Sequence, residues 1–243
     1  MSTSLAGRRV LVTGASSGIG LATVRAARAA GARVALLARR AEVLEALADE
    51  LGAIAVPADV TDPGAARGAV DRAAEQLGGL DAVVNAAGAL RPGPVAQTDP
   101  ADWRLMVEVN LLGVLHVTQA AIPHLRASEG VRDVVAVSSM SGRRLGSVGM
   151  GVYAATKAAV HMVGEGLRRE LGPDGIRVSV VAPGFVDTSL FQGSNADVDR
   201  LRDKAREVGL PAEEVAAGIV HVLAAPAGVL HAEVAMLSVE QLG

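Results

Sequence analysis

The fold is decided by the stretch Arg9-Val10-Leu11-Val12-Thr13-Gly14-Ala15-Ser16-Ser17-Gly18-Ile19-Gly20. It opens with a short apolar run rich in Val, which predicts a buried strand. Three glycines follow within seven residues, and the chain continues as an Ala-rich helix. Glycines allow a tight turn and a close approach of backbone N–H groups to a ligand. Because free N–H groups and the helix dipole point at one spot, this turn predicts an anion site. Its G-x-x-x-G-x-G spacing is not G-x-G-x-x-G, so an ordinary βα turn is the alternative.

Strand and helix patterns alternate along the rest of the chain. Strands are expected at Arg8–Thr13, Arg33–Leu37, Ala53–Pro57, Asp81–Asn85, Val131–Ser138, Ile176–Val181 and Val234–Ser238. Helices are expected at Gly18–Ala30, Ala41–Leu51, Pro63–Leu77, Pro100–Arg126, Val152–Leu171, Val198–Val208 and Ala212–Ala224. Asp62 and Asp99, each followed by Pro, are expected as N-caps. These repeated βα units predict a Rossmann-like α/β fold, a doubly wound parallel sheet of about seven strands with helices on both faces.

The composition fits a single domain over residues 1–243. The chain is 50% hydrophobic and 20% charged, with a formal net charge of −3 and no cysteine. The absence of a basic block argues against a nucleic-acid partner, and the absence of cysteine excludes disulfides and thiolate sites. We find no signal-peptide pattern and no apolar run of transmembrane length, so we expect a cytoplasmic protein without a membrane partner.

Polar and small residues follow the predicted strands, at the edge of the sheet where ligands of such folds bind. They are Ser16, Ser17, Arg39, Arg40, Asp59, Asn85, Ala86, Ala87, Gly88, Ser138, Ser139, Pro183 and Gly184. One polar loop means little, but six in register along one edge predict a cleft.

These residues resemble the short-chain dehydrogenase/reductase family, NADP-preferring type, over nearly the whole chain. The resemblance implies a cofactor site at Gly14, Ser16, Ser17, Gly18, Ile19, Gly20, Arg39, Arg40, Asp59, Val60, Asn85, Ala86, Ala87, Tyr153, Lys157, Pro183, Gly184, Val186 and Thr188. It implies a catalytic set of Asn110, Ser139, Tyr153 and Lys157. The family's N-N-A-G motif is Asn85-Ala86-Ala87-Gly88 here, which lacks the second amide. The loop between Ser139 and Tyr153 is one residue longer than usual, which leaves Ser138 as the alternative catalytic serine.

Tyr153 and Lys157 share one helix face at i and i+4. A nearby ammonium lowers the pKa of a phenol, although one lysine is insufficient to bring it near neutrality. Tyr153 is expected to exchange a proton with the substrate, and Ser139 to hydrogen-bond the substrate oxygen. The resemblance implies that Lys157 binds the ribose hydroxyls of the cofactor. It also implies that Asn110 binds a water that relays protons to Lys157. The alternative for Tyr153 and Lys157 is a half-buried helix aromatic beside a surface lysine. For Ser139 it is a serine that merely ends a strand, and for Asn110 a polar residue that packs between helices.

Arg39 decides the expected cofactor. Sites for NAD place a carboxylate near the end of the second strand, where it binds the ribose 2′-OH. Ala38 stands there instead and Arg39 follows it, so a planar guanidinium is available for the 2′-phosphate of NADP(H). Two surface arginines that open the next helix are the alternative. No histidine has metal-ligand spacing, and we expect no metal.

The segment at about 187–210 is expected to form a substrate lid, with Gly193-Ser194-Asn195 as its hinge or tip. We expect an NADP(H)-dependent oxidoreductase, such as a ketoreductase, that acts on a carbonyl or secondary alcohol substrate and forms a homotetramer or homodimer. A non-redox epimerase or dehydratase and a non-catalytic NADP-sensing protein are the alternatives. Arg91 and Arg143 would suit an acidic substrate if they reached the pocket mouth, but we expect them to be surface arginines.

Overall fold

The computed structural model describes residues 4–191 and 196–242. Its strands are β1 (Arg9–Thr13), β2 (Arg33–Leu37), β3 (Ile54–Ala55), β4 (Ala82–Asn85), β5 (Arg132–Val137), β6 (Ile176–Pro183) and β7 (Glu233–Met236). They form one parallel sheet in the order β3-β2-β1-β4-β5-β6-β7. The predicted Rossmann-like α/β class is confirmed.

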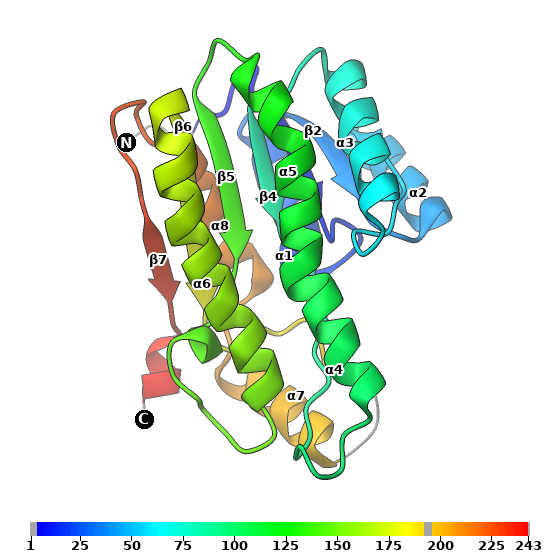
Figure 1. Ribbon diagram of the computed structural model, residues 1–243, viewed down its shortest axis with the longest axis vertical. Helices are drawn as coiled ribbons and strands as arrows, with labels where there is room; N and C mark the ends of the chain where they lie inside the picture. The colour runs from blue at the N-terminus through cyan, green and yellow to red at the C-terminus, as the bar shows by residue number, and fades with distance from the viewer. Residues whose placement is uncertain (1–3, 192–195, 243) are drawn as a thin grey trace.

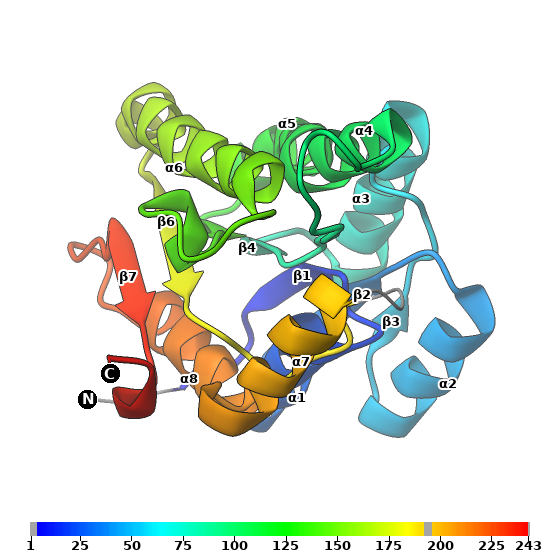
Figure 2. The same ribbon diagram turned by 90° about the horizontal axis from the view of Figure 1, so that it is seen from below.

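Helices cover both faces of this sheet (Figures 1 and 2). One face carries α1 (Gly18–Ala29), α2 (Ala41–Leu51) and α8 (Ala212–Leu223). The other face carries α3 (Pro63–Leu77), α4 (Pro100–Val107), α5 (Gly113–Arg126) and α6 (Gly151–Leu171). The remaining helix, α7 (Ala196–Val208), lies beyond the carboxyl ends of the strands, where Figure 1 draws it at the bottom.

Side-chain alternation along β1 explains how one strand serves both layers. Val10 and Val12 belong to the apolar core under α1 and α8, whereas Leu11 belongs to the core under α3 and α5. All three side chains are fully buried. Successive residues of a strand point to opposite faces, so a central strand must be apolar throughout. This is why the opening run of the sequence predicts a buried strand.

The two expected N-caps form as predicted. The Asp62 carboxylate accepts a 2.9 Å hydrogen bond from the backbone N–H of Ala65 at the start of α3. The Asp99 carboxylate accepts one of 2.8 Å from Ala101 at the start of α4. Each cap satisfies a backbone donor that the first helical turn leaves unpaired.

A single continuous helix runs from Pro100 to Arg126, because α4 and α5 are joined by a π-helical turn at Glu108–Leu112. By length and composition alone, this is one helix of the described chain that would be able to cross a membrane, with a mean hydropathy of 1.5. No apolar run of this length was expected from the sequence. The helix nevertheless reaches this mean hydropathy, because most of the polar residues that interrupt it are uncharged. About 44% of the apolar window is buried in the fold.

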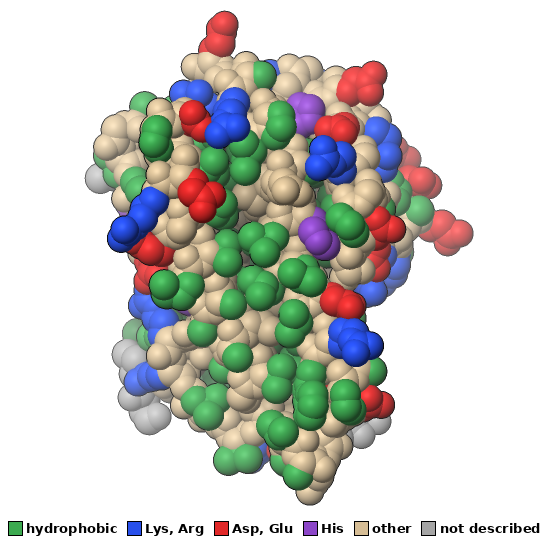
Figure 3. Space-filling model, viewed as in Figure 1, with side chains coloured by type: hydrophobic (Ala, Val, Ile, Leu, Met, Phe, Trp, Pro, Cys, Tyr) green, Lys and Arg blue, Asp and Glu red, His purple; other side chains and the backbone are tan. Residues whose placement is uncertain are grey.

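Apolar side chains also gather on the outer face of α4, α5 and α6, which Figure 3 shows as green side chains between the charged margins. Val107 and Leu112 are 37% and 38% exposed, and Met162 on α6 is 69% exposed. Contiguous apolar surface of this kind is typical of an interaction face.

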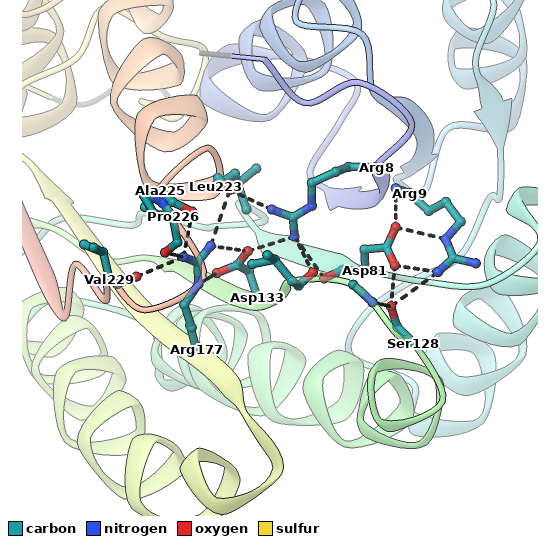
Figure 4. A network of polar contacts seen from close by, with 12 residues as sticks. Arg8, Arg9, Asp81, Ser128, Asp133, Arg177, Leu223, Ala225, Pro226 and Val229 are labelled. Atoms are coloured by element: carbon teal, nitrogen blue, oxygen red, sulfur yellow. Dashed lines mark hydrogen bonds and ion pairs between the residues drawn. The ribbon is translucent and has the colours of Figure 1, made fainter. Parts of the chain in front are cut away.

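The amino-terminal edge of the sheet is closed by an ionic network (Figure 4). Arg177 on β6 makes two hydrogen bonds with the carboxylate of Asp133 on β5, at 2.7 and 2.9 Å, and Arg8 adds a third at 2.8 Å. Asp133 is 1% exposed. Arg177 also donates to the backbone carbonyls of Ala225 and Val229, so the network fixes the turn after α8.

A second acidic group lies beside this network in Figure 4. Asp81 precedes β4 and accepts hydrogen bonds from Arg9 and Ser128. Burial alone would raise the pKa of Asp81, but these hydrogen bonds outweigh it and lower the pKa. Asp81 and Asp133 are therefore both paired with arginines at this edge of the sheet.

Candidate active site

A cavity of about 800 Å³ lies at the carboxyl ends of the strands. Most of the residues proposed from the sequence line it. They are Gly14, Ser16, Ser17, Gly18, Ile19, Gly20, Arg39, Arg40, Asp59, Val60, Ala86, Ala87, Ser139, Tyr153, Lys157, Pro183, Gly184, Val186 and Thr188. Asn85 and Asn110 do not line it.

The turn after β1 is shaped by close backbone contacts at two glycines. Gly14 has a φ of +64°, and a Cβ there would lie 2.8 Å from the Ala86 carbonyl oxygen. A Cβ on Gly20 would lie 2.3 Å from the carbonyl oxygen of Gly14. Neither position has room for a side chain, so the turn folds tightly onto the start of α1. Gly18, Ile19 and Gly20 at that helix start line the cavity, and the start of a helix is favourable for an anion.

Thr13 holds this turn against the neighbouring strand. Its hydroxyl oxygen accepts hydrogen bonds from the backbone N–H groups of Ala86 at 3.1 Å and Ala87 at 3.0 Å. The side chain is 1% exposed. No separate role was predicted for Thr13 from the sequence. A hydroxyl residue at the end of a central strand is the signal that could have identified it.

Cationic groups flank the end of β2. Arg39 and Arg40 both line the cavity, and Arg40 donates a 3.2 Å hydrogen bond to the Ser16 hydroxyl. Ala38 occupies the position where a carboxylate would oppose a phosphate. Asp59, beyond β3, accepts two hydrogen bonds from Thr61. Two guanidinium groups and a hydroxyl at this end of the cavity match a phosphate monoester on a ribose.

The two adjacent serines after β5 have different surroundings. The Ser138 hydroxyl donates a 2.8 Å hydrogen bond to the backbone carbonyl of Lys157, so it joins β5 to α6. The Ser139 hydroxyl accepts one of 3.1 Å from Ser141 and lies close enough to the Tyr153 phenol to lower its pKa. Ser139 is the serine that lies against the phenol.

Tyr153 and Lys157 are both buried on α6, at 6% and 4% exposed. Burial raises the pKa of Tyr153 to about 12, although the hydrogen bond with Ser139 opposes the rise. Burial lowers the pKa of Lys157 to about 8. The ammonium nitrogen lies 5.9 Å from the phenol ring centroid and donates a 2.9 Å hydrogen bond to the Val137 carbonyl. The expectation that lysine lowers the phenol pKa is corrected here, because desolvation has the larger effect.

Two amides proposed as site residues point away from the cavity. The Asn85 side chain donates a 3.1 Å hydrogen bond to Thr118 on α5, within the core. Asn110 lies in the π-helical turn and is fully buried. Its amide is paired with both backbone groups of Ala89, at 2.7 and 2.9 Å, and donates to Thr156 at 3.1 Å. Asn110 therefore joins the turn after β4 to α6, close behind Lys157.

The segment after β6 forms the opposite wall of the cavity. Leu210 donates to the carbonyl of Phe185, and Asp187 donates to the carbonyl of Leu210, so the two ends of the proposed lid are paired. Phe191 makes a parallel bridge with Leu90. The proposed hinge Gly193-Ser194-Asn195 lies outside the described residues.

A side chain missed by the sequence reasoning closes this wall. The carbonyl oxygen of the Gln241 side chain accepts a 3.0 Å hydrogen bond from the backbone N–H of Phe185. Gln241 lines the cavity and packs so closely on Gly184 that a Cβ there would overlap it. No motif marks a lone Gln this far along the chain. No group of three His, Cys, Asp or Glu residues able to hold a metal occurs in the described ranges.

Comparison with known proteins identifies relatives of this arrangement. The family model described as short chain dehydrogenase matches residues 8–199. A glycine betaine reductase of Emericella nidulans is 38% identical over 230 residues, which are 91% of this chain but 18% of that protein. An uncharacterized oxidoreductase of Staphylococcus aureus is 33% identical, with 93% of this chain and 95% of that protein covered.

Solved structures have the same architecture. A short chain dehydrogenase from Burkholderia cenocepacia, solved in complex with NADP, superposes with a TM-score of 0.86. It is 35% identical in sequence, with 98% of this chain and 99% of that chain covered. The likeness therefore extends over the whole sheet and the cavity at its carboxyl edge.

Proposed function

This chain belongs to the short-chain dehydrogenase family, and we propose that it transfers a hydride between NADP(H) and a carbonyl or secondary alcohol substrate. The observation that carries the proposal is the Ser139–Tyr153–Lys157 cluster, buried at the floor of a cavity that also holds the glycine turn. A bound nicotinamide supplies or accepts the hydride. The protein residues bind, orient and exchange a proton.

Tyr153 is the proposed proton donor in reduction and the proton acceptor in oxidation. Its raised pKa keeps the phenol protonated at neutral pH, which suits donation to a carbonyl oxygen that gains negative charge. Ser139, hydrogen-bonded with the same phenol, is suited to stabilise that oxygen. Both hydroxyls can then meet at one substrate oxygen.

Lys157 has a proposed double role, in cofactor binding and in the electrostatics of Tyr153. With a pKa of about 8, its ammonium remains mostly charged at neutral pH, which favours the phenolate when the proton leaves. Asn110 supports this group indirectly, because its amide holds the turn at Ala89 and Thr156 on α6. We assign Asn110 a positioning role.

NADP(H) is the proposed cofactor. The tight turn at Gly14 and Gly20 brings the start of α1 to the cavity, where a diphosphate would bind, and Arg39, Arg40 and Ser16 supply donors for the 2′-phosphate. The NADP complex of the Burkholderia relative supports this choice. We also propose that residues 187–210 act as a lid over the substrate and that the protein is a homodimer or homotetramer.

The proposal is tested with a panel of ketones, sugars and secondary alcohols, by following the absorbance of NADPH. A substrate that consumes NADPH or reduces NADP⁺ is expected, and Tyr153→Phe is expected to lose that turnover while still binding NADPH. Substrate conversion without net change in NADPH would instead indicate a non-redox reaction on the same fold.

A further inference from the structure

The cavity wall is strongly positive. Among the described residues that line it there are six cations and one carboxylate, Asp59. Arg39, Arg40 and Lys157 are assigned above to the cofactor and the proton. Three further cations remain on the substrate side, namely Arg91, Arg144 and Lys204. The whole chain carries a net charge of −3, so this excess of positive charge is local.

Lys204 is carried over the cavity by α7. The buried face of this helix, which includes Leu201 and Ala205, packs on the apolar cluster around Tyr153. The Lys204 ammonium lies 5.8 Å from the centroid of the Phe185 ring, above the segment that follows β6. Arg200 and Arg202 on the same helix pair with Asp197 and Asp199, whereas Lys204 makes no ion pair with any described residue.

Arg144 reaches the cavity from the turn after Ser139. This turn is pressed onto α6, since a Cβ on Gly142 would lie 2.7 Å from the backbone of Lys157. The neighbouring Arg143 faces outward and pairs with Glu233 on β7. Arg144 lines the cavity and has no ion-pair partner in the described part of the chain. Arg143 is thus a surface arginine, the favoured interpretation of the sequence, and its neighbour Arg144 lines the cavity instead.

The third cation is already engaged. Arg91 lies 3.6 Å from the Asp102 carboxylate and donates a 2.9 Å hydrogen bond to the carbonyl of Leu90. Apolar side chains also line this side, namely Met140, Leu145, Met150, Leu190 and Phe191, together with the uncharged hydroxyls of Ser141, Ser147 and Ser189. A cleft with low-dielectric walls and one sign of charge concentrates its field at the mouth and attracts ligands of opposite charge.

We propose that the substrate is an anionic carbonyl or hydroxy compound, whose carboxylate or phosphate binds Arg144 and Lys204. Its reacting carbon then lies at Ser139 and Tyr153, with an apolar chain between the two ends. The two cations approach from different elements, the turn after β5 and α7. An anion bound by both cations would therefore contact both elements. This inference rests on the proposed hydride transfer and adds the chemical class of the substrate.

The test compares matched charged and neutral substrates. Oxo acids of increasing chain length are assayed beside their methyl esters, and phosphorylated hydroxyketones beside the unphosphorylated ketones. We expect kcat/KM to be higher for one charged set by about tenfold or more, the effect of a charge-assisted hydrogen bond. The set that shows the preference distinguishes a carboxylate from a phosphate. Added salt should reduce the preference for the charged substrates, because Arg144 and Lys204 are exposed.

The variants Arg144→Met and Lys204→Met remove the charge and keep an apolar stem. In the double variant, kcat/KM for the charged substrate divided by kcat/KM for the neutral substrate should fall close to one. Turnover of the neutral substrate should stay near that of the unmodified protein. Arg200→Ala, which removes a cation from the same helix outside the cavity, is the control and should leave the ratio unchanged. Equal losses for charged and neutral substrates in the double variant would overturn the inference.

Calorimetric titration of the charged and neutral compounds into the protein with NADP⁺ separates this inference from hydride transfer. Tighter binding of the anion that is lost in the double variant supports the anion site, even if no compound is turned over. Turnover of neutral compounds without any preference for an anion, in binding or in kcat/KM, retains the oxidoreductase proposal and rejects the anion site. Equal binding of charged and neutral compounds, without turnover, rejects the anion site as well.

Discussion

The Ser138 hydroxyl donates a 2.8 Å hydrogen bond to the backbone carbonyl of Lys157. The next residue, Ser139, is the serine that lies beside Tyr153. Successive residues at the end of β5 point in opposite directions. Both serines line the cavity, but the Ser138 hydroxyl joins the end of β5 to α6, whereas the Ser139 hydroxyl lies beside the Tyr153 phenol. Chain position alone does not separate them, but their hydrogen bonds do.

Ser139→Ala should lower kcat by about 100-fold or more, because it removes a donor for the substrate oxygen. Its melting temperature should change little. Ser138→Ala should leave the chemistry nearly intact and destabilise the fold by about 0.5–1.5 kcal/mol, because the Lys157 carbonyl loses the hydrogen bond that joins α6 to the end of β5. Steady-state kinetics and thermal unfolding of both variants check this. The reverse pattern would make Ser138 the catalytic serine.

Tyr153→Phe should reduce turnover by about 10²–10⁴-fold, because the proton donor is lost while the ring is kept. Since burial raises the pKa of Tyr153 to about 12, the phenol is protonated at neutral pH, and carbonyl reduction should vary little with pH there. Alcohol oxidation needs the phenolate, so its rate should increase as pH increases toward that pKa. Rate profiles in both directions check this.

The increase in oxidation rate should be absent in Tyr153→Phe. Near-normal turnover of a verified substrate by this variant would remove Tyr153 from the mechanism. Lys157→Ala should also lower the rate and weaken cofactor binding, and the double variant should lose no more than the larger single effect, because the two residues act as one unit.

Arg39→Ala should weaken NADPH binding by about 1.5–3 kcal/mol, because it removes a charge-assisted contact with the 2′-phosphate. NADH binding should change little, since NADH lacks that phosphate. Fluorescence titration with both cofactors measures this. Arg67→Ala, which removes an exposed cation of α3 outside the cavity, is the control. Equal affinity of the unmodified protein for NADPH and NADH would reject the assignment.

Asp133→Ala should destabilise the protein by about 3–5 kcal/mol, because it leaves Arg177 and Arg8 buried near the sheet edge without their shared carboxylate. Denaturant unfolding measures the loss. Glu165→Ala, whose carboxylate pairs with two arginines on the surface of α6, should cost well under half of that. Similar losses for both variants would mean that burial of the network contributes nothing.

Met162→Glu should shift the protein toward a smaller assembly, because it puts a charge on the exposed apolar face of α4, α5 and α6 (Figure 3). Light scattering after size exclusion measures the mass. Val43→Glu, on α2 at the opposite face of the sheet, is the control and should leave the assembly unchanged. A monomeric mass for the unmodified protein would reject the oligomer.

The fold and the cofactor turn could be predicted from sequence because they depend on local signals. Apolar strands, Asp-Pro caps and glycines at fixed spacing determine the sheet, the starts of α3 and α4, and the turn after β1. Ser138, Asn85 and Arg143 could not be placed in this way. Each belongs to a polar segment beside the cavity, and only the three-dimensional partners, Lys157, Thr118 and Glu233, show where its side chain is engaged.

The electrostatics could not be predicted from spacing either. The i and i+4 positions of Tyr153 and Lys157 suggest mutual stabilisation, but they contain no information about how deeply α6 is buried. Desolvation reverses the expected direction for the phenol pKa. Gln241 was missed for a related reason, because its contact with Phe185 depends on how the turn after β7 returns to β6.

The pairing of β1 with β4 also sets the order in which a growing chain can complete its cavity. The glycine turn gains the Thr13 contacts only after Ala86 and Ala87 have left the ribosome, and the pair on α6 emerges much later. Gln241 reaches Phe185 later still. The residues that shape the glycine turn therefore all precede residue 88, whereas proton exchange requires residues 139–157, so the chain completes its cofactor turn and its chemical groups in separate stretches of sequence.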